Sequence, residues 1–422
     1  MKTRVIRRDG YENGAALARA WQEDGLIPAP HGEVFEFYRL VDKEAVERLG
    51  DEEGMQGPEL NLLEPFAKQA RLAGRERDVA RVREWTEPRL LDAVGDIHRE
   101  RLAEPFDPHR YPEMQGLAQF QDREAKGIAD VFGTDFRRIL LCQDQYRRLV
   151  YLRVSGEAEA APADAGSCTS VIFKESPVGP IVGRNMDSGI GSVAGLQGFG
   201  DPVMFRFPEE MGHSYMGTAL AVNEHGLTIQ GSSIAYAHEQ TDAGFWVDIG
   251  PLVLRCCSTT AEALDLIDRY STMTGPSNLV LIDGDCDAVA VEKSKNTYAV
   301  RRTDTPWIFT TDGVAVEEKT AAIQGQTPLH EFHVARHRLI ERLLGEAESN
   351  PSVEAMRRIM RDHTPPSPVC KHLDQMPEDY PLATLYSFLL VPRTGEYHFW
   401  VTRPGPEYPC TFEPTLHRFS FE

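Results

Sequence analysis

A cysteine near the middle of the chain has the sequence surroundings of a catalytic nucleophile. Cys168 follows a glycine and Ser167, precedes an apolar run, and is followed after a short interval by Arg184-Asn185-Met186-Asp187. A thiol attacks an acyl carbon as the thiolate, so it needs a base beside it and hydrogen-bond donors for the oxyanion. If the bond between Ser167 and Cys168 were cut, the new α-amino group, with a reference pKa of about 7.7–8.0, would be that base. No histidine would then be required.

The residue types near Cys168 predict further roles. Asp187 is a candidate acceptor for the liberated α-ammonium or thiol hydrogen, and Arg184 is a candidate to hold the thiolate or that carboxylate through charge-assisted bonds. Thr169 either caps the backbone locally or takes part in catalysis by donating to the intermediate or positioning a water. A set of polar residues is predicted to contact substrate, namely Asn185, Ser232 and Ser233, although the two serines could also simply end a strand.

Composition favours a folded protein without a polyanionic partner. The chain has 422 residues, of which 41% are hydrophobic, enough to fill a substantial core. Its 45 Lys+Arg against 65 Asp+Glu give a net charge of -20, which repels nucleic acid and anionic lipid surfaces. The amino terminus is charged where a secretion signal needs apolar residues, and no run approaches the length of a membrane span. We therefore expect a cytoplasmic protein.

The cysteines do not indicate a disulfide framework. There are 7 of them, an odd and scattered set in a long chain, and those other than Cys168 are best interpreted as small buried hydrophobic residues. Cys370-Lys371-His372 lacks the paired spacing of a zinc site. We expect no metal and no cofactor.

The pattern of the chain changes near residue 150. Before it, charged and apolar residues recur at helical spacing. Residues 155–166 are small and polar, which is typical of an exposed linker. Beyond them lie short runs typical of strands, at 171–173, 181–182, 203–205, 227–229, 279–282, 289–291, 307–309, 385–391 and 397–401.

Turn and cap signals order these strands. Asp283-Gly284-Asp285 and Arg393-Thr394-Gly395 each lie between two runs and predict hairpins. A capping box at 259–262 opens a helix that should end at Tyr270, and Thr327-Pro328 should open another to about Leu344. Strand clusters separated by helices predict an α+β layered domain.

Several short segments, taken in order, resemble the acyl-coenzyme A:isopenicillin N acyltransferase family of autoproteolytic N-terminal nucleophile (Ntn) hydrolases. Gly183-Arg184-Asn185-Met186-Asp187 matches the family's Gly-x-Asn-x-Asp element, and its arginine is also similar to that of the bile-salt and penicillin V hydrolases. The resemblance extends over nearly the whole chain. Its other segments are 10–14, 124–129, 168–170, 223–227, 383–385 and 403–405.

The chain departs from the family's pattern at two positions. Ser167 stands where the family usually has glycine, and a side chain there restricts the strained conformation that cleavage exploits. Thr310-Thr311-Asp312 stands where the family has Thr-Asn-His, whose asparagine supplies an oxyanion donor. Thr311, Asn278 or backbone N–H groups would have to serve instead.

The resemblance implies an Ntn-hydrolase αββα four-layer sandwich in residues 168–422, with a helix-rich proregion, residues 1–167, packed against it. Self-cleavage between Ser167 and Cys168 would convert this zymogen into a non-covalent heterodimer of its own two chains. The implied activity is formation of a thioester on Cys168 from a small-molecule amide or acyl thioester, followed by acyl transfer to an amine or to water in secondary metabolism. The implied partners are therefore small molecules, not nucleic acid or membrane.

Two other functions stay open. A single-chain Cys-His hydrolase would use a distant histidine as its base. An uncleaved, degenerate family member would act as a binding protein. Alanine replacement of each histidine and labelling of Cys168 by an acylating probe would distinguish them.

Overall fold

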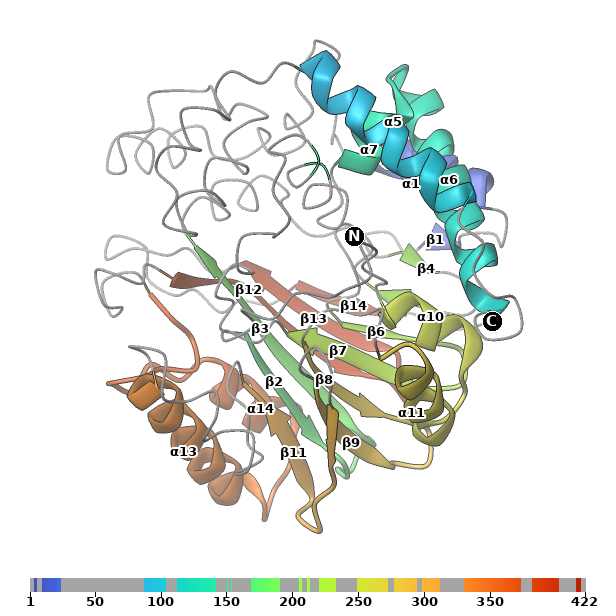
Figure 1. Cartoon of the computed structure of the whole chain (residues 1–422). Coiled ribbons are helices and arrows are strands. Elements are labelled where there is room, and N and C mark those ends of the chain that lie inside the picture. The colour runs from blue at the N-terminus through green and yellow to red at the C-terminus, as the bar shows by residue number, and fades with distance from the viewer. Residues whose placement is uncertain are drawn as a thin grey trace.

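Helices dominate the described part of the amino-terminal third, which also contributes one short strand, and two sheets with flanking helices form the rest (Figure 1). This computed structural model describes residues 4–5, 10–23, 87–103, 112–141, 150, 153, 168–189, 205–206, 211–212, 220–232, 249–271, 277–293, 298–311, 330–372, 382–401 and 415–418. The predicted linker 155–166, Ser167, Ser233 and Asp312 lie outside these residues. The fold mixes helices with largely antiparallel sheets, as the sequence predicted.

The amino-terminal helices pack against one another. They are α1 (Gly10–Glu23), α5 (Glu87–Ala103), α6 (Pro112–Phe132) and α7 (Phe136–Leu141). Tyr11 Oη on α1 donates to Asp130 Oδ2 on α6 at 2.7 Å, and His98 Nε2 on α5 lies 2.7 Å from Asp122 Oδ1 on α6. Apart from Arg4–Val5, which form a short strand, the predicted helical character is confirmed for the described part of this region.

Two glycines allow α1 and α6 to cross closely. A Cβ on Gly14 would lie 1.9 Å from the carbonyl oxygen of Glu124, and one on Gly127 would lie 2.1 Å from that of Tyr11. Both obstacles are backbone atoms, so no side-chain rotation could relieve them. The amino-terminal segment 10–14 and the helical segment 124–129, far apart in sequence, are therefore packing partners.

Gly127→Ala should lower the free energy of unfolding by about 1–3 kcal/mol, because the two helices must move apart to admit one methyl group. The matched control is Gly345→Ala in α13 (His330–Ala347), where a Cβ would meet nothing within 4 Å. That control should raise stability by roughly 0.5–1 kcal/mol, since alanine loses less backbone entropy than glycine. Chemical denaturation of both variants checks the pair, and equal shifts would contradict the close crossing.

One sheet has eight described strands in the order β1-β4-β5-β6-β7-β8-β9-β10. Its pairs are antiparallel except for the parallel pair β1–β4. The strands are β1 (Arg4–Val5), β4 (Phe205–Arg206), β5 (Met211–Gly212), β6 (Leu220–Val222), β7 (Thr228–Ser232), β8 (Ser277–Ile282), β9 (Ala288–Lys293) and β10 (Tyr298–Arg301).

The other sheet has six described strands in the order β11-β2-β3-β12-β13-β14, all antiparallel. These are β2 (Thr169–Phe173), β3 (Ile181–Gly189), β11 (Trp307–Thr310), β12 (Leu382–Val391), β13 (Glu396–Val401) and β14 (Thr415–Arg418). Strands β2 and β3, which carry the predicted site, lie side by side in its interior.

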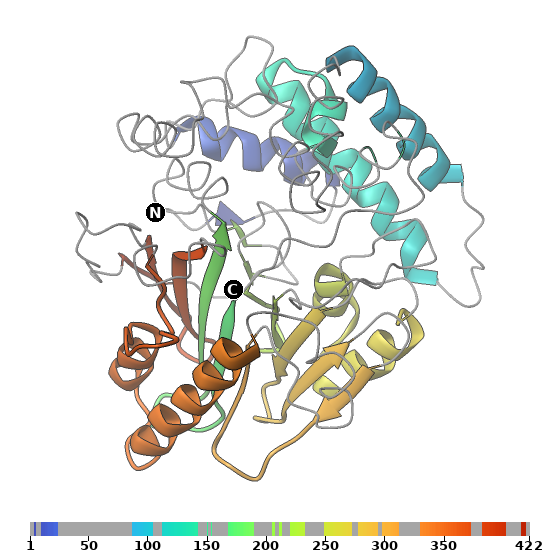
Figure 2. The same cartoon turned by 60° about the vertical axis from the view of Figure 1, so that its left-hand side comes forward.

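Each sheet packs against its own pair of helices. An apolar cluster joins β7, β8 and β9 to α10 (Ile249–Cys256) and α11 (Thr260–Arg269). A second cluster joins β2, β11 and β12 to α13 and α14 (Val353–Met360). Strands β2 and β11 also contact strands β7, β8 and β9 of the other sheet, and Figure 2 shows the strands between the two helix pairs. Strands β2 and β9 are buried at every residue because both of their faces are covered.

The turns follow the predicted local signals. Asp283-Gly284-Asp285 turns between β8 and β9, and Arg393-Thr394-Gly395 turns between β12 and β13. Thr259 caps α11 by accepting a hydrogen bond from the Glu262 amide at 3.2 Å, and Tyr270 ends the helix. Both hairpins and this helix are confirmed.

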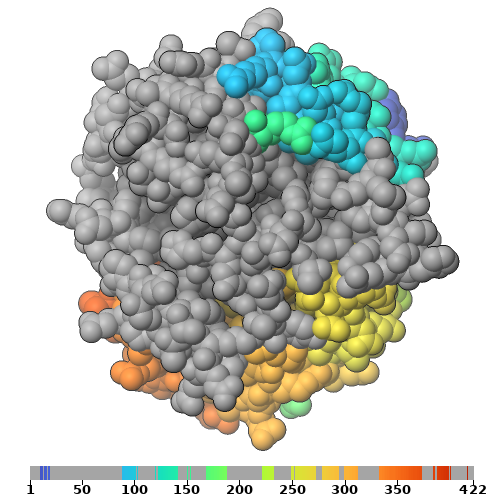
Figure 3. Space-filling model, in the orientation of Figure 1, coloured from blue at the N-terminus to red at the C-terminus, as the bar shows by residue number. Residues whose placement is uncertain are grey.

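The structure adds elements that the sequence pattern did not predict, among them α10, α14 and β14. On the side of the molecule that Figure 3 shows, residues of α5 and of the α10–α11 segment lie at the surface. None of the described helices combines the length and the apolar character that crossing a membrane requires.

Candidate active site

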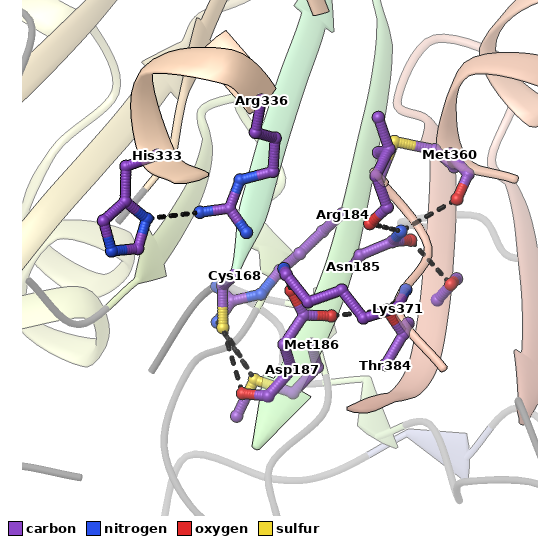
Figure 4. Close-up of polar contacts among 12 residues, drawn as sticks. Cys168, Arg184, Asn185, Met186, Asp187, His333, Arg336, Met360, Lys371 and Thr384 are labelled. Atoms are coloured by element: carbon purple, nitrogen blue, oxygen red, sulfur yellow. Dashed lines mark hydrogen bonds and ion pairs between the residues drawn. The ribbon is translucent and has the colours of Figure 1, made fainter. Parts of the chain in front are cut away.

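Cys168 lies directly before β2 in the six-stranded sheet (Figure 4). The register pairs Thr169 with Asn185, which places Cys168 one step further, opposite Met186. The sulfur lies 3.4 Å from Met186 Sδ and 3.8 Å from the backbone oxygen of Asp187. Only 2% of Cys168 is exposed, so the residue is enclosed.

Arg184 places a positive charge beside this sulfur. Its Nη2 lies 3.7 Å from Cys168 Sγ and 3.3 Å from Met186 Sδ, and the residue is buried. Arg184 and Met186 are two residues apart on one strand and so project from the same face of the sheet. The arrangement can stabilise negative charge on the sulfur.

The carboxylate of Asp187 projects from the other face of β3 and is fully enclosed. Lys371 Nζ donates to its Oδ2, and Thr384 Oγ1 donates to its Oδ1 at 2.6 Å. The strand register also pairs Thr384 with Asp187. The Lys371 amide donates to Thr384 Oγ1 at 2.8 Å, so the hydroxyl connects the lysine backbone to the carboxylate. Both oxygens of Asp187 are thereby fixed in position.

Two side chains of opposite charge, Arg336 and Asp187, act on the buried Lys371. Burial lowers the pKa of Lys371 to about 8, with Arg336 lowering it further and Asp187 opposing both. Arg336 is fully buried on α13, and its Nη2 lies 3.2 Å from His333 Nδ1. Cations thus gather around the Cys168–Asp187 region, which suits chemistry that develops negative charge.

His333 should make the stability of the protein depend on pH. Burial, with a smaller contribution from Lys371, lowers the pKa of His333 to about 3. As the pH falls below about 6.5, His333 therefore binds a proton in the unfolded chain but stays neutral in the folded chain. The free energy of unfolding falls as the pH drops below that value. At pH 5 this one group should cost about 2 kcal/mol relative to pH 7.

His333→Gln should remove this part of the pH dependence, because glutamine does not titrate yet can still accept a hydrogen bond from Arg336. Urea unfolding of both proteins between pH 7 and pH 5 measures the effect. Parallel curves for the two proteins would mean that the imidazole does not stay neutral in the folded state.

The side chain of Asn185 forms hydrogen bonds that connect secondary-structure elements. Its amide donates to the backbone oxygens of Met360 at 2.8 Å and Val369 at 2.9 Å, and its oxygen accepts from Ser387 Oγ at 2.6 Å. These bonds connect β3 to β12, to the end of α14 and to the segment that follows it. The predicted contact of Asn185 with substrate would require some of them to break, since the side chain is fully buried.

The two candidate oxyanion donors are brought together across the sheets. Asn278 Nδ2 donates to the backbone oxygen of Thr311 at 2.5 Å. Thr310 pairs with Ser170, so Thr311 lies one step on, opposite Thr169. Asn278, Thr311 and Thr169 are all buried. Ser232 ends β7 opposite Asn278, while the placement of its side chain, like all of Ser233 and Ser167, lies outside the described structure.

Sequence reasoning missed the groups that surround Asp187. In the sequence, Lys371 belongs only to an incomplete zinc motif, and Thr384 belongs only to the short segment 383–385 that resembles the family. Arg336 and His333 carried no signal beyond their place in a helical pattern. The sequence offered one signal for a buried role of Lys371. It is a charged residue within a segment of cysteine, histidine and proline residues, where a solvent-exposed lysine would have no evident function.

Comparisons with known proteins give distant structural similarity only. No protein-family model matches the chain, and no curated protein sequence matches it. A mutant of conjugated bile acid hydrolase from Clostridium perfringens is 11% identical, covering 60% of this chain and 97% of its own, with a TM-score of 0.36. Another variant of that hydrolase is 10% identical over 61% of this chain and 85% of its own, with a TM-score of 0.31.

A third solved structure is penicillin V acylase from Agrobacterium tumefaciens. It is 12% identical, covers 57% of this chain and 77% of its own, and has a TM-score of 0.32. At such low identity and TM-score, these similarities decide neither family nor activity.

Proposed function

We propose that the chain is a self-cleaving cysteine acyltransferase or amidohydrolase of the Ntn class. The observation that carries the proposal is the 3.7 Å separation between Cys168 Sγ and Arg184 Nη2 in a buried setting. A lone buried cysteine is usually inert. An adjacent buried guanidinium is the feature expected of a sulfur that must become an anion.

Self-cleavage needs no open pocket, which fits the burial of Cys168. The sulfur would attack the carbonyl carbon of Ser167, and the C–N bond would break as the nitrogen takes up the thiol proton. Water would then hydrolyse the resulting thioester, releasing the carboxylate of Ser167 and regenerating the thiol. The electrophile belongs to the neighbouring residue, so it is already within reach.

The liberated α-amino group of Cys168 would act as the base in turnover. The strand register places Cys168 opposite Met186, the residue before Asp187, and the carboxylate of Asp187 would orient the ammonium. The amine would take the thiol proton, and the sulfur would attack the acyl carbon of a small-molecule amide or acyl thioester. The leaving group would receive that proton, and an amine or water would then take the acyl group.

We further propose that the packed helices and sheets form the αββα four-layer Ntn sandwich over residues 168–422. Residues 1–167 would be the proregion and would remain bound after cleavage as the smaller chain. Contact between α6 and α10 supports a continuing association. Acyl transfer in a small-molecule pathway, in the cytoplasm, remains our preferred activity.

Mass measurement of the intact purified protein tests the proposal. Wild-type protein should give two chains, residues 1–167 and 168–422, while Cys168→Ala should stay at 47.3 kDa. The matched control is Cys256→Ala, which removes an exposed thiol and should cleave normally. A single full-length wild-type chain that is fully active would exclude the α-amino base.

The alternative of a Cys-His hydrolase gains no support from His333. A histidine whose pKa is about 3 is a poor proton acceptor at neutral pH. A binding protein without catalysis would leave Cys168 unlabelled by an acylating probe, whereas the proposed enzyme should be labelled at that residue alone.

A further inference from the structure

Three side chains of the kinds that bind zinc meet in the segment that follows α14. The ligand atoms of His363, Cys370 and His372 all lie within 4.8 Å of one another. The two imidazole rings are nearly perpendicular, at 84°, with their centroids 4.8 Å apart. Cys370 is fully buried, and both histidines are partly exposed.

Backbone bonds hold the three residues together. The Cys370 amide donates to the Asp362 carbonyl oxygen at 3.0 Å, which closes the segment and brings His363 beside Cys370. Asp362 also accepts from the Thr364 amide at 2.8 Å and from Thr364 Oγ1 at 3.1 Å. The spacing of Cys370 and His372 alone indicated no metal site; the closed turn supplies the third residue.

We propose that His363, Cys370 and His372 bind one Zn²⁺ ion, with a water as the fourth ligand. One thiolate and two imidazoles form a donor set suited to zinc and unsuited to Mg²⁺ or Ca²⁺, which prefer oxygen. Ligand atoms of a tetrahedral zinc site lie roughly 3.4–3.7 Å apart at ordinary bond lengths. Small side-chain rotations would close the remaining distance.

The site would hold Lys371 in position. The ligand atoms of Cys370 and His372 lie within 4.8 Å of each other, whereas Lys371 between them donates to Asp187. Thr384 bonds the same segment through the Lys371 amide and carbonyl, at 2.8 Å and 3.0 Å. Zinc on one side and the Lys371–Asp187 pair on the other would fix the segment from both directions. The proposal does not depend on self-cleavage or on acyl transfer.

Cobalt substitution in the full-length protein, expressed without a histidine tag, tests the site. Chelator-treated protein should bind one equivalent of Co²⁺ and develop a near-ultraviolet thiolate-to-cobalt absorption, with visible bands of four-coordinate strength. Added Zn²⁺ should displace the cobalt and abolish both. Because this measurement uses the wild-type chain, it does not depend on whether any variant folds.

Substitution of each proposed ligand shows which residues bind the metal. Cys370→Ser should lose the thiolate absorption, and His363→Ala and His372→Ala should each weaken cobalt binding at least tenfold. Cys168→Ala and Cys256→Ser should bind cobalt as wild type does, which separates this site from the proposed nucleophile. Absence of a saturable cobalt spectrum in wild-type protein, or its persistence in Cys370→Ser, would overturn the proposal.

Discussion

Lys371→Met should lower the free energy of unfolding by about 3–5 kcal/mol, because it leaves the buried Asp187 carboxylate without its cation. Both side chains of this pair are 0% exposed, so water cannot replace the lost partner. Chemical denaturation of purified protein measures the loss. This is the largest stability effect that we expect from a single substitution in the described structure.

Two further variants test the cause of that loss. Lys126→Met makes the same substitution at a lysine that is 47% exposed and paired with Asp122 at 2.8 Å, and it should cost less than about 1 kcal/mol. Adding Asp187→Asn to Lys371→Met should recover part of the stability, since the unpaired charge is then gone. A double variant less stable than Lys371→Met would show that lost packing, not the buried charge, is responsible.

Arg184→Met should slow self-cleavage roughly 100-fold, similar to the loss of one preorganised donor in an active site. The guanidinium is 3.7 Å from Cys168 Sγ, and methionine would keep an unbranched apolar stem while removing the charge. The fraction of cleaved chain, followed by intact mass after cell-free synthesis, measures the rate.

Arg184→Lys serves as the control because it keeps the positive charge but loses the planar fork. It should cleave at a rate between those of wild type and Arg184→Met. If Arg184→Met cleaves as fast as wild type, the arginine is a packing residue and the proposed function loses its main support.

The sequence alone specified most of the local structure in the described residues. Strands β2, β8 and β9 follow from short β-branched runs, and the β8–β9 and β12–β13 hairpins follow from Asp-Gly and Thr-Gly turns whose backbone demands are local. The cap at Thr259 is equally local, because donor and acceptor lie three residues apart. The helix α14 was missed although Ser352 and Glu354 give it a cap signal; its eight residues are too few for a clear periodic pattern.

For the site, the sequence determined which residues share one strand. The spacing of Arg184 and Asp187 places them on β3, and alternation along that strand then requires their side chains to lie on opposite faces. The tertiary structure decided what each face meets. Arg184 reaches Cys168 because β2 pairs with β3, whereas Asp187 meets Lys371 and Thr384, which come from distant parts of the chain. Contacts over such separations depend on how whole layers pack, and no local period encodes them.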